Sequence, residues 1–84
     1  MSATEHALLA VLALDAGRVE TAEQHISLAR QEARATARRD RQVVEIASLV
    51  IRGDRRRAAG LAAEHTFEFP HDGPLLRQLT GSDR

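Results

Sequence analysis

Residues Leu8 to Ala33 read LLAVLALDAGRVETAEQHISLARQEA: a dense apolar run, a glycine, and a second run in which apolar residues recur at intervals. Apolar residues spaced three and four positions apart are typical of one face of a helix. Gly17 is a natural left-handed cap for the end of the first helix. The stretch therefore predicts two helices that fold back on each other at Gly17.

A second, looser copy begins at Val43 with VVEIASLVIRGDRRRAAGLAAEHT. Gly53 lies 36 residues after Gly17, and Ala58 lies 36 residues after Ala22. Self-similarity of that length is typical of helix-turn-helix repeats. We therefore expect an all-α fold in which two antiparallel helical hairpins stack on each other.

Capping residues set the expected helix boundaries. Ser2 and Glu5 have the spacing of a capping box, so the first helix should begin near residue 3. No Gly or Pro separates the second helix from the third, and one continuous helix over 19–52 is an alternative. We favour a break near residues 37–39, with Asp40 as the N-cap of the third helix.

The second hairpin has its own signals. The β-branched residues between Val43 and Ile51 leave a short buried strand as a competing interpretation. Asp54 is a good N-cap for the fourth helix, which should end by residue 68, shortly before Pro70. Residues 72–74 then begin a short final helix that Gly81 ends. The expected single domain has hairpins over about 3–37 and 40–67 and a capping helix over about 73–80.

Composition excludes several classes of protein. The 84 residues carry no net charge, and the absence of Cys removes disulfides and Cys-bearing metal sites. The longest apolar run, Ala7 to Leu14, is much shorter than the ~20 residues of a membrane span. No basic region followed by a hydrophobic core opens the chain. We expect a cytoplasmic protein without membrane association.

The pattern resembles the tetratricopeptide repeat. The matching residues of the two copies are Leu9, Ala10, Gly17, Val19, Ala22, Ile26 and Ala29, then Leu49, Gly53, Asp54, Ala58, Ala62 and Pro70. The run from Arg39 to Asp72 is also similar to the tetratricopeptide repeat protein 38 family. The usual aromatic positions of the repeat are Val19, Arg55, Ile26 and Ala62 here, which departs from the pattern. The resemblance implies a helical scaffold with a protein-binding concave face and no established chemistry.

If the first helix of each hairpin lines that face, the groove is apolar. Its expected partner-binding residues are Ala7, Val11, Leu14, Val43, Ala47 and Val50. Such a groove suits an amphipathic partner helix or a second copy of the chain, which would make a homodimer. The simpler alternative, which we favour because large exposed apolar patches are uncommon in monomers, is that these residues are core, covered by Leu75, Leu76 and Leu79.

The middle of the chain is basic. Residues 30–57 hold nine Arg and four acidic residues. The candidate basic surface consists of Arg30, Arg34, Arg38, Arg41, Arg55, Arg56 and Arg57. Phosphate contacts could use such a cluster, so a small nucleic-acid-binding protein is the alternative function. Because no aromatic residue lies near to stack on bases, we favour a solvated face paired with acidic neighbours.

Catalytic and metal interpretations find little support. The four His are scattered, and no two of them have the spacing of a helical zinc motif. The densest group is His65, Glu68, His71 and Asp72, which we treat as a minor candidate for a metal site. No recognised nucleophile pattern or glycine-rich phosphate loop occurs. We therefore expect a protein-interaction or assembly module that is not an enzyme and uses no cofactor or metal.

Overall fold

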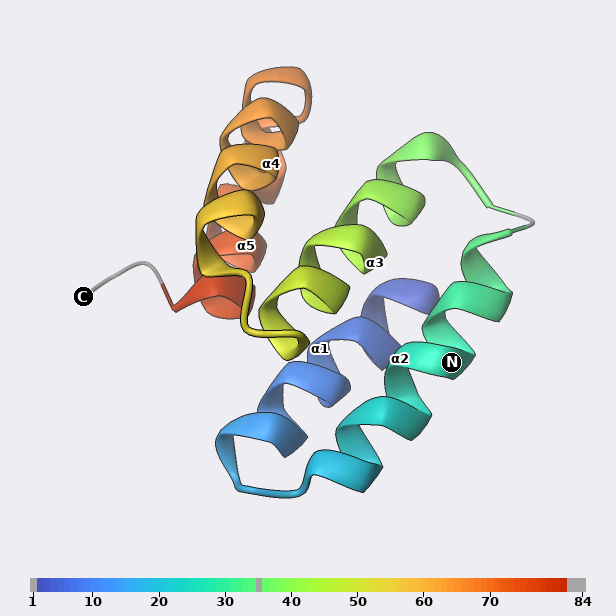
Figure 1. The fold of residues 1–84 in the computed structure, drawn as a ribbon. Coiled ribbons are helices and arrows are strands. Elements are labelled where there is room, and N and C mark those ends of the chain that lie inside the picture. Colours follow the sequence, from blue (N-terminus) through green and yellow to red (C-terminus); the bar gives the residue numbers. More distant parts are fainter. Residues whose placement is uncertain (1, 35, 82–84) are drawn as a thin grey trace.

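The computed structural model describes residues 2–34 and 36–81, and those residues form an all-α fold (Figure 1). The elements are α1 (Ala3–Asp15), α2 (Val19–Ala33), α3 (Arg38–Ile51), α4 (Arg55–Glu68), the 3₁₀ turn η1 (Pro70–Asp72) and α5 (Gly73–Thr80). The predicted fold class is confirmed. The alternative of a buried strand within residues 43–51 is wrong, because these residues lie inside α3.

The two hairpin corners are built identically. Gly17 and Gly53 both have left-handed backbones, with φ of 79° and 83°. At the first corner the amide of Gly17 donates to the carbonyl of Leu14, and the amide of Arg18 donates to that of Ala13. The same pair of hydrogen bonds recurs 36 residues later at the second corner. These are the two bonds of a Schellman motif, so the repeat seen in the sequence is a repeat of backbone geometry.

Two of the three predicted side-chain caps form at helix starts. Ser2 Oγ accepts from the amide of Glu5 at 3.1 Å, and the Glu5 carboxylate accepts from the amide of Ser2 at 2.9 Å. These hydrogen bonds hold the pKa of Glu5 below its usual value. The Asp54 carboxylate accepts from the amide of Arg57 at 3.3 Å. The beginnings of α1 and α4 are thus set by local chemistry.

The connection between α2 and α3 contains the expected break and corrects the expected N-cap. A continuous helix over 19–52 is wrong, because α2 ends at Ala33 and α3 begins at Arg38. Asp40 is not the N-cap: that position belongs to Ala37, whose carbonyl accepts from the amide of Asp40. The Asp40 carboxylate instead accepts from the Arg39 guanidinium at 3.0 Å and from the Thr4 hydroxyl at 3.3 Å. It lies in the first turn of α3, where a negative charge favours the helix dipole.

Helix α3 runs through the middle of the molecule, with α1 and α2 on one side and α4 and α5 on the other (Figure 1). Its buried side chains join those of α1, α2 and α5 in one core. The largest fully buried apolar members are Val43, Ile46 and Leu79. The first hairpin packs closely along its length, while α3 and α4 diverge and α5 packs against both.

The short C-terminal helix completes the core as expected. Leu76 and Leu79 are almost fully buried, and Leu75 packs at the edge of the same cluster. Gly81 ends α5 with a left-handed φ of 62°. Helix α4 contributes little large apolar surface, since Ala58 and His65 are its only fully buried residues in the described chain. The leucines of α5 therefore fill the space that α4 leaves.

Candidate protein-interaction surface

The six residues expected to line an apolar groove do not form one. Ala7, Val11, Val43, Ala47 and Val50 are at most 5 % exposed and belong to the core, and Leu14 is half-buried. The groove interpretation is therefore wrong. The alternative is confirmed, because Leu76 and Leu79 of α5 belong to the same core cluster and Leu75 packs against it.

The seven Arg of the candidate basic surface are all exposed, but they do not form one patch. Arg30, Arg34, Arg38 and Arg41 lie around the connection between α2 and α3, whereas Arg55, Arg56 and Arg57 begin α4 (Figure 1). The remaining ten residues of α3, 42–51, separate the two groups by about 15 Å at 1.5 Å per residue. Arg38 is also paired with Glu68 at 3.1 Å.

The residues of the minor candidate metal site make other contacts. His65 and Asp72 do meet, with Nε2 and Oδ2 2.7 Å apart, but the Arg39 guanidinium occupies the carboxylate through two further bonds of 2.7 and 2.8 Å. His71 is exposed. Within residues 2–34 and 36–81 no three His, Cys, Asp or Glu gather in a way that could hold a metal ion.

Arg39, Gln42, His65 and Asp72 form a polar cluster, here called the clasp, that joins α3, α4 and η1. The His65 ring is fully buried; its Nδ1 lies 2.6 Å from Gln42 Oε1, and its face packs on Phe69 with ring centroids 4.8 Å apart. The hydrogen bonds from Arg39 hold the pKa of Asp72 below its usual value, against the opposing effect of desolvation. The same contacts raise the pKa of Arg39.

The clasp fixes which face of α4 points outward. Successive residues of a helix are rotated by about 100°, so Phe67 lies about 200° around the helix from His65. With His65 held inward by Asp72, Phe67 must face solvent, and it is 90 % exposed. The clasp itself has no local sequence signal, because Arg39 and Asp72 are 33 positions apart.

Phe67 belongs to an exposed face of α4, here called the α4 outer face, made of Arg56, Gly60, Ala63 and Phe67. Their spacing of four, three and four residues keeps them on one seam of the helix. A Cβ atom on Gly60 would meet nothing within 4 Å, so the fold itself does not require a glycine there. Shallow grooves against α3 and α5 border this face, which stands as a ridge between them.

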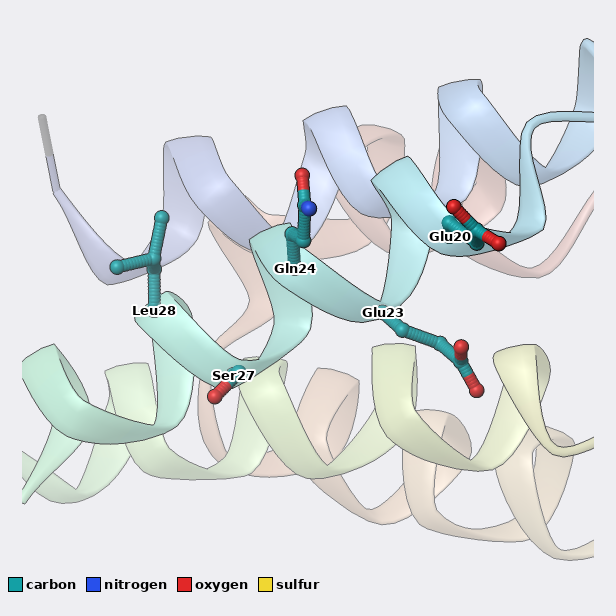
Figure 2. A pocket seen from close by; sticks show the side chains of 5 residues that line it. All are labelled: Glu20, Glu23, Gln24, Ser27 and Leu28. Carbon is teal, nitrogen blue, oxygen red and sulfur yellow. The ribbon is translucent and has the colours of Figure 1, made fainter.

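A separate hollow lies on the outer surface of α2. Its lining residues are Glu20, Glu23, Gln24, Ser27 and Leu28 (Figure 2). Figure 2 shows that these side chains spread over the helix and do not converge on a common point. The hollow is a shallow depression with two carboxylates and one half-exposed leucine, so its chemistry indicates no particular ligand.

Comparisons with protein-family models, with curated proteins and with solved structures find nothing that matches this chain. Within the part of the chain that the structure describes, no helix is both long and apolar enough to traverse a bilayer.

Proposed function

We propose that the chain is a non-catalytic protein-interaction or assembly module of the helical-repeat type, and that its contact surface is the α4 outer face. The main observation behind this proposal is that the Phe67 side chain is exposed. The chain has only two Phe, and the other one, Phe69, packs on the His65 ring. Burying a Phe side chain is worth about 1.5–3 kcal/mol, which this fold leaves unused at position 67.

The surroundings of Phe67 also suit a protein partner. Aromatic residues and Arg are enriched at the centres of interfaces, and Phe67 and Arg56 lie on the same face. Between them Gly60 and Ala63 present almost no side chain, so another helix could approach closely. Stacked helical hairpins usually act by binding other chains, which agrees with the role implied by the tetratricopeptide resemblance.

The alternative of nucleic-acid binding gains no support from the arrangement of the Arg residues. A duplex or single strand is held best by a continuous basic track. The two Arg groups here lie at opposite ends of α3.

The test is site-specific photo-crosslinking in the cells that make the protein. A photoreactive phenylalanine replaces Phe67, and in a matched control it replaces Leu12, which is 48 % exposed on α1. We expect a protein adduct, identified by mass spectrometry, at position 67 but not at position 12. Adding Ala63→Glu should remove the adduct, since it places a charge in the contact. No adduct at position 67, or equal adducts at both positions, would overturn the proposal.

A further inference from the structure

We propose that the partner of the α4 outer face is the same face of a second copy of the chain, with the two α4 helices antiparallel about a two-fold axis. This inference rests on the proposed function and names its partner. A two-fold contact pairs each residue with its counterpart in both directions, so one face must complement itself. The α4 outer face does so in shape, and the charged residues beside it on α4 do so in charge.

The charges of α4 decide the direction of pairing. Its first three residues, Arg55, Arg56 and Arg57, are basic, while its acidic residues Glu64 and Glu68 lie in the second half. Parallel helices would bring like charges together. Antiparallel helices place the basic half of each copy against the acidic half of the other, and their dipoles are then opposed as well.

The spacing of the outer face sets the register. With the axis between Gly60 and Ala63, Gly60 of one copy lies opposite Ala63 of the other, and Arg56 lies opposite Phe67. The small central pair allows the helix axes to approach to about 8 Å, the lower end of the usual range. Arg56 can then place its guanidinium over the exposed Phe67 ring, a cation–π contact that forms twice in the dimer.

A pair of flanking charges adds to this contact. Arg57 and Glu64 border the same groove beside the outer face, towards opposite ends of α4. In the antiparallel dimer each Arg57 therefore faces Glu64 of the other copy. Both side chains are available: Arg57 reaches Asp54 only at 4.0 Å, and within residues 2–34 and 36–81 Glu64 makes no ion pair.

The exposed Gly60 is an independent argument that a partner helix packs on α4. An exposed glycine inside a helix costs about 0.5–1 kcal/mol relative to alanine. Nothing in the described chain lies near enough to Gly60 to require the missing side chain. A helix of a second copy at this point would require it.

The contact is small, since α4 has only 14 residues, and an interface of this size is typical of a weak, transient dimer. The experiment is therefore sedimentation equilibrium from micromolar to millimolar concentration, with circular dichroism as a check that each variant is folded. The wild type should shift from monomer to dimer across this range. Ala63→Glu should raise the dissociation constant at least about tenfold, because it buries an unpaired charge.

A charge exchange tests the antiparallel register. Arg57→Glu alone and Glu64→Arg alone should each weaken the dimer about threefold or more, because each sets like charges opposite one another. The double variant should regain wild-type association. Glu20→Arg, on the outer surface of α2, is the matched control and should leave association unchanged. If the double variant is no stronger than the single ones, the antiparallel pairing is wrong.

The outcomes separate this inference from the proposed function. A wild type that remains monomeric at millimolar concentration, together with an adduct from position 67 to a different protein, overturns self-pairing and leaves the interaction role in place. A monomer with no adduct at that position removes both proposals. A dimer that Ala63→Glu does not weaken would place the contact elsewhere and overturn the inference.

Discussion

Asp72→Asn should destabilise the domain far more than the loss of any surface ion pair. The substitution keeps the size of the side chain but removes the charge that holds Arg39 and His65. In the native structure the Asp72 carboxylate accepts two bonds from Arg39 and contacts His65 Nε2, all at 2.7–2.8 Å. The amide cannot accept at both positions, so at least one donor of Arg39 or His65 loses its partner.

The magnitude follows from burial. Removing one member of a fully buried pair costs about 3–5 kcal/mol. The Asp72 side chain is only 10 % exposed, but that of Arg39 is 38 % exposed, so water screens part of the interaction. We therefore expect a loss of about 2–3 kcal/mol, which for a domain of this length lowers the melting temperature by about 10–20 °C.

The assay is thermal and urea unfolding in an Ala63→Glu background, so that self-association does not contribute to the apparent stability. Glu68→Gln is the matched control, because it breaks the Arg38–Glu68 pair, whose side chains are 65 % and 39 % exposed. Its loss should be below about 0.5 kcal/mol. Equal losses for the two variants would refute the idea that the clasp holds α4 and η1 on α3.

The pH dependence of this difference has a definite sign. The pKa of Asp72 is lowered in the folded state, chiefly by the hydrogen bonds from Arg39. Its contribution to the free energy of unfolding is therefore complete above the ordinary aspartate pKa of about 3.9 and is lost as the pH falls below it. The stability gap between wild type and Asp72→Asn should narrow as the pH falls below about 4.

Three further substitutions test the fold. Gly17→Ala forces a side chain into a backbone with φ of 79° and should lower the free energy of unfolding by about 1–2 kcal/mol in urea titrations. Ile46→Val, at a fully buried position, should cost about 0.5–1.5 kcal/mol by the same method. Ser2→Ala removes the capping box with Glu5 and should cost about 0.5–2 kcal/mol, with faster amide exchange confined to the first turn of α1.

The hairpin corners were predictable because their causes are local. A glycine after an apolar run, followed by a polar residue and a new helix, describes both Gly17 and Gly53. The structure gives both a positive φ and the same hydrogen bonds. The N-cap of α3 was not predictable in this way. Asp40 has the right side chain for a cap, but contacts with Arg39 and with Thr4 of α1 direct it elsewhere.

The choice between a groove and a core was not predictable from the sequence for a related reason. An apolar face shows that something covers it, but the sequence does not show whether the cover is a partner or another part of the chain. Here the cover includes Leu76 and Leu79 from α5. The α4 outer face was not among the surfaces predicted from the sequence. Ala58, Leu61 and Ala62 already mark the inner side of α4, and the buried His65, bonded to Asp72, lies on that side too, which leaves Phe67 exposed.

Gly60→Ala separates the forces within one chain from those between two chains. In dilute solution the added methyl group meets no neighbour, so better helix propensity should raise the stability of the monomer by about 0.5–1 kcal/mol. At millimolar concentration the same methyl group stands where α4 of a second copy must approach, so the dimer should weaken. A gain in monomer stability with unchanged dimerisation would show that the second copy does not contact Gly60, and a loss in dilute solution would show that Gly60 has a role inside the fold.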